Sequence, residues 1–547
     1  MSRLICATIA WLCHSTGFAL LFIATDCNAV LTDNLTIGNA KAIGLGHAVT
    51  ADPPGIDAIH FNPAGLAELR GRQSQYKLIS GDFSVVLEFG DYMEERQDLI
   101  DEKQADGNFP DGFFTDSAKN TTSETEGATL MLPFVGMTDI PVLLGVVGGA
   151  SYSPPGSNFT FATGVYTPLA VGFNRADDDP GRFIGSRLSL FRLTYFAPTL
   201  AYRLSETLSL GAGINFSYSG VGLDLNFRGP HVGLISLAEI QQQWCDQQQA
   251  PPIDVCGGQL PLYGELGELS VAVEDPLSLG INVGALWQPM PWLSVGAVYQ
   301  SESDMNMEGE FTWNSSDSWV NFLEPIIADD LYQGASDFIG LLGWSLPQGK
   351  PNLHGKASLD MTMPEHFALG ISLQITPSFK VNMDYKFTAW SAWPALPIEF
   401  SVPIDVLRLA EIVQPDVAAR DKVVFPFGLE DSWNYAIGLE YQVNDQLSLR
   451  AGYEPRASSV PADSITPLLP VGDGTFYGVG MGYQLLRGGS WDIGLGYFAS
   501  EVDMKDGASR LGNSTDPTLL IYNPYPGTDI TAKLSVILLE ISYQKRF

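Results

Sequence analysis

The sequence has little positive charge, few cysteines and, beyond its N-terminal segment, no long apolar run. Its 547 residues carry 29 Lys and Arg against 62 Asp and Glu, which gives a formal net charge of −33 at pH 7. Because phosphate groups are bound by a basic face, and no basic run occurs, a nucleic-acid partner is excluded. After residue 29 no apolar stretch is long enough for a helical membrane span.

Recognisable catalytic motifs are also absent. The chain contains no Gly-x-Ser-x-Gly and no His-Glu-x-x-His, the patterns that bring a nucleophile or a zinc ion next to a base. Its histidines are scattered along the sequence rather than grouped. We therefore predict that the protein is not an enzyme, and we assign it no cofactor and no metal site.

Residues 1–29 are typical of a secretory signal. Arg3 provides the positive start, Leu4–Thr25 is mostly apolar, and Cys27-Asn28-Ala29 fits cleavage before Val30. A retained membrane anchor is the alternative. A lipoprotein is disfavoured because the residues before Cys27 are not small.

Two cysteines remain after such cleavage, Cys245 and Cys256. A single pair in an exported protein is most simply a disulfide, so we predict one here. No histidine lies near the pair, which argues against a metal site.

The remaining composition favours a transmembrane β-barrel. Mean hydropathy is slightly positive at +0.07, with 56 Gly and 11% aromatic residues, and the apolar residues alternate with polar ones. In the segment Phe379–Thr388, Val381 and Tyr385 share one face, whereas Asp384 and Lys386 share the other. Charged side chains on the enclosed face of a strand fit a polar lumen better than the core of a soluble sandwich.

We predict an all-β fold, a transmembrane antiparallel barrel of about fourteen strands with a small N-terminal hatch inside the lumen. Short connections alternate with long ones, the pattern of short periplasmic turns and long extracellular loops. The expected strands are 74–90, 126–138, 141–153, 188–203, 206–222, 269–288, 291–305, 356–376, 378–393, 430–443, 446–456, 476–486, 490–503 and 531–547. The expected organisation is a signal peptide (1–29), a hatch (30–73) and the barrel with its loops (74–547).

The hatch prediction rests on the segment from Ala42 to Leu69. It is apolar, rich in Gly and Ala and nearly uncharged, yet it does not alternate as a strand does. Asn62 is suited to cap a helix and Pro63 to occupy its first position, so a short helix is expected over Ala64–Leu69. A segment of small residues suits close packing inside a larger body.

Three motifs carry a resemblance to a known family. Gly44-Leu45-Gly46-His47-Ala48, followed by Asn62-Pro63-Ala64, resembles the N-terminal hatch of the FadL/TodX family of outer-membrane channels for long-chain fatty acids and hydrophobic compounds. Tyr385–Trp393 and Leu449–Arg456 are similar to two later signatures of that family. The loop with the two cysteines has no counterpart that we can match.

The resemblance implies passive diffusion. Extracellular loops would capture a hydrophobic ligand, a hatch containing Gly44, Gly46, Asn62, Pro63 and Ala64 would fill the pore, and a kinked third strand would release the ligand sideways into the membrane. Pro cannot donate to a strand ladder, so Ser153, Pro154, Pro155 and Gly156 are the candidates for that lateral opening. Arg450 and Lys386 have the inward parity and are candidates to bind a carboxylate in the lumen, unless neighbouring acids pair with them.

The expected ligand is a long-chain fatty acid, with an aromatic or alkane hydrocarbon as the alternative. The expected location is the outer membrane of a Gram-negative bacterium, in contact with its lipid and lipopolysaccharide, and the expected state is a monomer. A non-specific porin, an adhesin or a phage receptor are alternatives of another class.

Overall fold

The structure, a computed structural model, describes residues 38–245, 253–341, 343–413, 418–486, 488–516, 519 and 523–547. The signal predicted for residues 1–29 lies outside this part of the chain. Antiparallel strands form a 14-stranded barrel, which closes where the first strand pairs with the last, from Gln73–Arg546 to Tyr92–Thr528. The barrel prediction is thus confirmed.

Ten wall positions hold one continuous strand, and four are interrupted and hold two strand segments. In order around the wall, the strands are β1 (Gly71–Tyr92), β5 (Leu143–Ser153), β6 with β7 (Phe159–Gly164, Tyr166–Asn174), β8 with β9 (Arg187–Phe196, Thr199–Arg203), β10 (Leu208–Arg228), β11 (Glu265–Met290), β12 with β13 (Leu293–Gln300, Ser303–Ser315), β14 with β15 (Asn352–Met363, His366–Thr376), β16 (Phe379–Thr388), β19 (Ser432–Gln442), β20 (Leu447–Arg456), β21 (Gly474–Leu485), β22 (Gly489–Met504) and β23 (Thr528–Arg546). β17 (Leu396–Phe400) follows β16 in the chain and pairs with β14 and with β18 (Lys422–Phe425).

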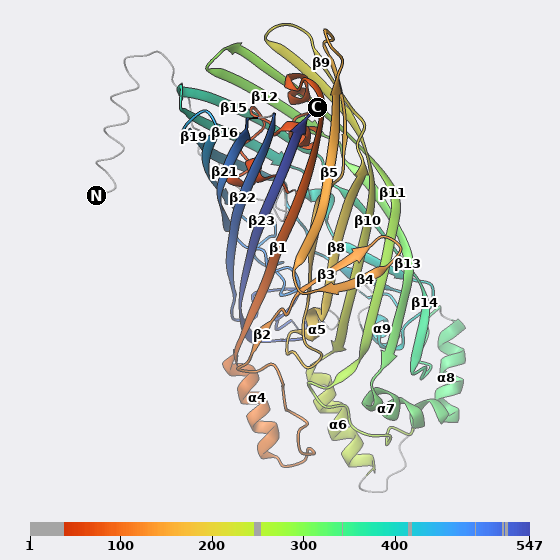
Figure 1. The fold of residues 1–547 in the computed structure, drawn as a ribbon. Helices are drawn as coiled ribbons and strands as arrows, with labels where there is room; N and C mark the ends of the chain where they lie inside the picture. Colours follow the sequence, from red (N-terminus) through yellow and green to blue (C-terminus); the bar gives the residue numbers. More distant parts are fainter. Residues whose placement is uncertain are drawn as a thin grey trace, which may run out of the picture.

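The two ends of the barrel differ. Tight turns join the strands at one end, the turn end, whereas long connections with helices cover the other, the loop end (Figure 1). The helices of the loop end are α4 (Glu94–Ala105), α5 (Arg182–Gly185), α6 (Val232–Cys245), α7 (Asp317–Ala328), α8 (Asp330–Leu341), η3 (Trp390–Ala392) and α9 (Asp405–Val413). In the part of the chain that the structure describes, no helix combines the length and the apolar character needed to cross a membrane.

The side-chain alternation has the parity that the sequence predicted. On β16, Tyr385 is exposed on the outer surface, whereas Asp384 and Lys386 are buried in the lumen. On β19, Trp433 and Tyr435 are likewise exposed. Apolar side chains therefore face outward and polar ones inward at this level of the wall, as a barrel surrounded by lipid requires.

Two strand assignments from the sequence are wrong. Residues 126–138 do not cross the wall, because β3 (Ala128–Leu132) and β4 (Gly136–Ile140) form a separate hairpin. Between β1 and this hairpin, β2 (Thr122–Glu124) pairs with β1 and with no other described strand. The third wall position is instead held by β6 and β7, inside the predicted long connection 154–187. β7 escaped detection because both of its faces are covered and it contains Pro168, so its residues do not alternate.

The segment before β1 lies inside the half of the lumen nearest the turn end. It contains α2 (Ala40–Gly44), η1 (Gly55–Asp57), α3 (Ala58–Phe61) and η2 (Pro63–Glu68), which contact β20–β22 on one side and β9–β11 on the other. The predicted helix start is confirmed, since the Asn62 side chain accepts a hydrogen bond from the amide of Ala64 and Pro63 follows it. The helix is a 3-10 helix, and the first wall strand begins at Gly71 rather than at residue 74.

Candidate functional site

Backbone groups of the N-terminal segment are hydrogen-bonded to polar side chains of the wall. The carboxylate of Asp384 accepts the amides of Val49 and Thr50 at 2.9 and 2.8 Å. On the opposite side, Asn282 donates to the carbonyls of Ile59 and His60 at 2.6 and 2.7 Å. Because short helices leave amides and carbonyls unpaired, these wall side chains satisfy groups that would otherwise be buried without partners.

Asn62 fastens the same segment twice more. Its amide donates to the carbonyls of Thr50 and Ala285 at 2.8 and 3.1 Å, while its oxygen caps η2. All three interactions use a side chain that is fully buried. Asn62 therefore connects two parts of the segment to β11.

Glycines on both sides of this contact allow the backbones to approach closely. Gly46 has a positive φ of 59°, and a Cβ atom there would lie 2.6 Å from the backbone nitrogen of Tyr453. A Cβ at Gly284 of β11 would lie 2.1 Å from Oδ1 of Asn62. Of the other residues singled out in the sequence, Gly44 lies against Gly480 of β21, and Pro63 and Ala64 lie against Gly211 of β10.

The lumen cations proposed from the sequence are paired with acids. Arg450 binds Glu440 and Asp492, each at 2.6 Å. Lys386 binds Glu454 at 2.9 Å, and the same carboxylate also pairs with Arg456 and contacts His47. A carboxylate ligand at either site would have to displace a buried partner.

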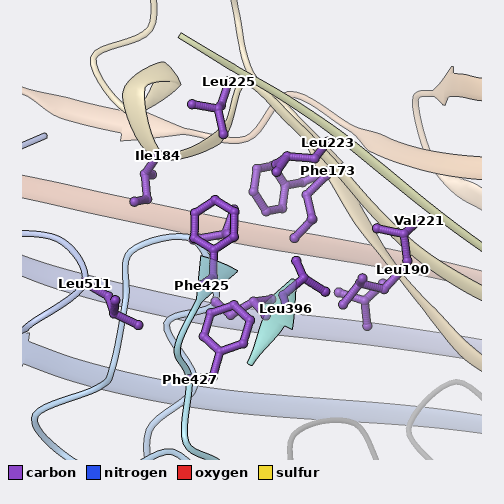
Figure 2. Packing of buried hydrophobic residues seen from close by; sticks show 14 of the residues in the cluster. Phe173, Ile184, Leu190, Val221, Leu223, Leu225, Leu396, Phe425, Phe427 and Leu511 are labelled. Carbon is purple, nitrogen blue, oxygen red and sulfur yellow. The ribbon is translucent and has the colours of Figure 1, made fainter. Parts of the chain in front are cut away.

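The half of the lumen nearest the loop end is apolar. Side chains from β7, α5, β8 and β10 meet Leu396, Phe425 and Phe427 from the β17–β18 region, as Figure 2 shows. Together they belong to a large cluster that continues along β11, β13 and β23. An apolar molecule entering from the loop end thus meets hydrocarbon first and the polar N-terminal segment only later.

Arg192 lies at the boundary between these two halves. It projects from β8 into the lumen with 4% of its surface exposed, and it donates to the hydroxyls of Ser219 and Ser303 at 3.2 and 2.9 Å. No carboxylate among the described residues forms an ion pair with it. In the same pocket lies Trp390, whose buried indole N–H has no hydrogen-bond partner in the described part of the chain.

The Arg192 pocket therefore presents a buried positive charge and an unpaired indole N–H next to the apolar cluster. Tyr166, Thr194, Gln300 and His366 are among the other residues that line it. Sequence reasoning missed Arg192. The signal was available, because Leu188, Leu190, Arg192 and Thr194 share one face of a strand whose other residues face outward.

A second apolar space lies outside the barrel mouth, between α6, α7 and α9. It has a volume of about 530 Å³ and is lined by Leu237, Trp319, Phe322 and Leu409 among others. Tyr332 at its edge donates its hydroxyl to the carbonyl of Pro347, and burial raises the pKa of this phenol to about 12. Its lining is mostly hydrocarbon, with the neutral hydroxyl of Tyr332 and with Arg228 and His231 among the polar residues. We call it the loop groove.

The predicted disulfide is present beside the loop groove. Cys245, the last residue of α6, is bonded to Cys256. The side chain of Gln241 adds hydrogen bonds to the carbonyls of Val255 and Gly258. These links hold α6 against the segment that leads into β11.

The wall has a seam between β5 and β7. Starting from the turn end, β5 pairs with β6 as far as Gly149–Gly164. From there toward the loop end, the edge of β7 that faces β5 has one pairing within the described residues, the bridge from Asn174 to Gly127. The β3–β4 hairpin covers the seam from outside (Figure 1), with Leu130 and Met131 packed on Ala170, Phe191 and Tyr218. A cavity lined by Gly81, Leu143 and Gly172 reaches from the seam toward the lumen.

A family model for outer membrane protein transport proteins (OMPP1/FadL/TodX) matches residues 21–547. The chain belongs to this family. It is therefore an outer-membrane β-barrel of the Gram-negative type, from a family of transport proteins and not of enzymes, and the turn end and loop end of the barrel are its periplasmic and extracellular ends.

Individual relatives of the FadL/TodX family are distant. Outer membrane protein P1 of Haemophilus influenzae is 25% identical over 326 residues, which is 58% of this chain and 58% of that protein. The long-chain fatty acid transport protein of Escherichia coli K12 is 20% identical over 298 residues, 54% of this chain and 58% of that protein. The aligned part thus spans little more than half of these relatives.

Solved structures of the family share the fold. A Pseudomonas aeruginosa FadL homologue superposes with a TM-score of 0.62 at 16% identity, covering 95% of this chain and 99% of the other. The P. putida toluene transporter TodX gives a TM-score of 0.59 at 15% identity, covering 94% and 99%. At these identities the likeness concerns the fold alone.

The residues that the sequence suggested for a lateral opening lie at the end of β5 and in the turn after it. Ser153 ends β5, and Pro154, Pro155 and Gly156 form the periplasmic turn before β6. The third wall strand, which the family resemblance expects to be kinked, is interrupted at Val165, between β6 and β7. The break therefore lies beside the seam and not in the turn.

Proposed function

We propose that the protein carries long-chain fatty acids across the outer membrane by passive diffusion. The observation that carries this proposal is Arg192, a buried guanidinium that forms no ion pair among the described residues, with Asp275 the acid that acts on it, on the periplasmic side of the apolar cluster. A fatty acid has the matching form, a hydrocarbon chain with one carboxylate. A charged group in such a place favours an oppositely charged ligand because charge-assisted hydrogen bonds are the stronger ones.

The route begins at the loop groove and continues into the apolar half of the lumen. Each methylene transferred from water to an apolar site contributes about 0.8 kcal/mol, so the long chain supplies most of the free energy of capture. The carboxylate then reaches Arg192 and the indole N–H of Trp390. Transfer needs no energy source because each step moves the chain between apolar environments.

The ligand leaves through the seam between β5 and β7 into the membrane. The N-terminal segment acts as the hatch that closes the path to the periplasm, since it fills the lumen on the periplasmic side of Arg192. On this proposal the β3–β4 hairpin has to move away from Phe191 and Tyr218 for each passage.

Uptake of an aromatic hydrocarbon is the second candidate, favoured by the mostly apolar lining of the loop groove and by the apolar cluster in the half of the lumen nearest the loop end. A hydrocarbon would use the same route but would gain nothing from Arg192. The relatives include both a long-chain fatty acid transport protein and a toluene transporter. The two ligand classes therefore differ in their need for a cation.

A competition experiment tests the proposal. Purified protein is loaded with a fluorescent fatty acid and titrated with oleate, oleyl alcohol and toluene. We expect oleate to displace the probe at a concentration at least tenfold lower than oleyl alcohol, because the two differ only in the charged head group. Equal displacement by the alcohol, or stronger displacement by toluene, would favour the hydrocarbon channel.

A further inference from the structure

The turn of the β3–β4 hairpin carries two exposed apolar side chains. Pro133, Phe134 and Val135 join the two strands, and the amide of Val135 donates to the carbonyl of Leu132 at 3.2 Å. Phe134 is 94% exposed and Val135 is 70% exposed. Among the described residues, no other large apolar side chain is as exposed as Phe134. We call these three turn residues the hairpin tip.

The backbone of the hairpin tip is unfavourable for a phenylalanine. Phe134 has a φ of 63°, in the left-handed region, and Gly136 follows with a φ of 88°. A bulky residue rarely adopts a positive φ because its Cβ crowds the backbone, whereas Gly and Asn adopt it more readily. The turn by itself would therefore be served better by Gly or Asn at position 134. A role for the aromatic side chain accounts for its presence there.

The lipid-facing band of the wall has an outer edge that can be located on β11. Exposed apolar side chains continue along this strand from Trp287, which is 49% exposed, to Leu277, which is 54% exposed. With a rise of about 3.3 Å per residue and a tilt of about 40°, this stretch covers about 25 Å of membrane thickness. An outer-membrane barrel has an apolar band of about this height. Leu277 therefore marks the extracellular edge of the band.

The β3–β4 hairpin crosses the outside of the wall just beyond this edge (Figure 1). Met131 covers Gly220 of β10, where a Cβ atom would lie 2.5 Å from its Cγ, and Gly220 pairs with Glu274 of β11. Glu274 is about 8 Å further along the barrel axis than the edge of the band. Ala272 of β11 packs against the apolar cluster of the hairpin. Because the head groups of a bilayer extend about 5–8 Å beyond its hydrocarbon, the hairpin lies at head-group level.

We propose that the hairpin tip is a membrane anchor, in which Phe134 and Val135 insert into the outer leaflet of the membrane that the barrel spans. Aromatic and other apolar side chains at the membrane interface hold a protein segment there by burying their surface among acyl chains. The tip is the end of the hairpin furthest from the seam, whose bridge joins Gly127 to Asn174. The anchor thus holds the free end of the hairpin against the membrane surface.

The position of the tip selects lipid over another protein. Outer-leaflet lipid surrounds the barrel at this level, and the tip lies directly beyond the lipid-facing residues Leu277 and Leu279 on the same outer face of the wall. A second copy of the chain could cover the tip only after this lipid had been displaced from between the two barrels.

The test places a fluorescent label beside Phe134 in the mature protein, reconstituted into vesicles of phosphatidylethanolamine and phosphatidylglycerol. Val135→Cys is labelled with a nitrobenzoxadiazole group without reductant, so that the disulfide between Cys245 and Cys256 stays closed. A lipid with a nitroxide on its acyl chain quenches labels inside the membrane, whereas iodide quenches labels in water. Compared with a label at Phe338→Cys, on an exposed residue of α8, we expect roughly threefold stronger quenching by the nitroxide and roughly threefold weaker quenching by iodide.

Phe134→Asn removes the aromatic ring and keeps the turn, because asparagine tolerates a positive φ. In the protein labelled at position 135, this change should weaken nitroxide quenching roughly threefold, and the matched change Phe338→Asn should leave it unaltered. A label at Leu279→Cys, on a lipid-facing residue of β11, gives the signal for full lipid contact. Heat-dependent migration on gels verifies that each barrel is folded.

Three results would overturn the anchor. The first is iodide quenching at position 135 as strong as at Phe338, which would place the tip in water. The second is nitroxide quenching that Phe134→Asn leaves undiminished. The third is a label shielded from both quenchers, which would assign the tip to a contact with a second copy of the chain.

Discussion

Replacing Arg192 by methionine is the sharpest test of how the lumen recognises its ligand. Methionine preserves an unbranched, mostly apolar stem but removes the guanidinium that donates to Ser219 and Ser303. A hydrogen bond to a charged group contributes about 1.5–3 kcal/mol, and each 1.4 kcal/mol is about a tenfold change in affinity. We therefore expect oleate to bind the R192M protein roughly 10- to 150-fold more weakly.

The assay is equilibrium binding of radiolabelled oleate to purified protein, with toluene binding measured on the same samples. Toluene has no carboxylate, so R192M should bind it with unchanged affinity. Arg450→Gln is the matched lumen control, because Arg450 is already paired with Glu440 and Asp492. This variant should bind oleate with unchanged affinity. Its thermal stability should fall, since breaking a buried ion pair costs about 3–5 kcal/mol. If R192M bound oleate with wild-type affinity, or lost as much affinity for toluene as for oleate, the role of Arg192 would be refuted.

Three further predictions concern the route. Cysteines at Met131 and Gly220, whose Cβ atoms would lie 3.1 Å apart, should lock the β3–β4 hairpin when oxidised and stop uptake until a reductant is added, whereas a wild-type protein given the same treatment should be unaffected. Leu409→Lys in the loop groove should weaken capture about tenfold at low ligand concentration, and Leu331→Lys, exposed but outside the groove, should not. Asn62→Ala should speed amide exchange in the N-terminal segment while the barrel strands keep their protection; slower uptake with unchanged exchange would contradict the fastening role.

The sequence predicted the wall well where one face of a strand meets lipid and the other the lumen. Tyr385 and Asp384 have opposite environments, so the two-residue period is strong on β16. It failed on β7, where Ala170 and Gly172 are covered outside by the β3–β4 hairpin and Val171 is buried inside. A strand buried on both faces loses its alternation, and periodicity then cannot distinguish it from a loop.

The candidate site was likewise predicted only in part from the sequence. Local signals located the N-terminal segment, because a cap at Asn62 and glycines at close approach depend on neighbouring residues. Pairing of lumen charges depends on strand register, which brings Arg450 opposite Glu440 and leaves Arg192 among hydroxyls. Parity alone gives each arginine the same inward direction and cannot say which of them has an acid beside it.

The hydrogen bonds between the hatch and the wall make movement of the hatch costly in free energy. Asp384 accepts two amides, Asn282 donates to two carbonyls, and Lys77 binds Asp57 at 2.8 Å. Hydrogen bonds to charged groups contribute about 1.5–3 kcal/mol each, so withdrawing the whole segment would cost on the order of 10 kcal/mol before any ligand contact offsets it.

The seam is held by fewer polar contacts than the hatch. Within the described residues, the part of β7 nearest the loop end is joined to its neighbour on that side by one bridge at Asn174. The hairpin over it is held by apolar packing, by an ion pair between Arg187 and Asp139 at 3.0 Å and by a hydrogen bond from the amide of Met131 to the hydroxyl of Ser189 at 2.7 Å. A departing acyl chain can replace apolar packing with contacts of the same kind, but it cannot replace hydrogen bonds to Asp384 or Asn282. We therefore expect the hairpin to open and the hatch to stay, so that cross-linking the hatch to the wall should leave uptake intact while locking the hairpin abolishes it.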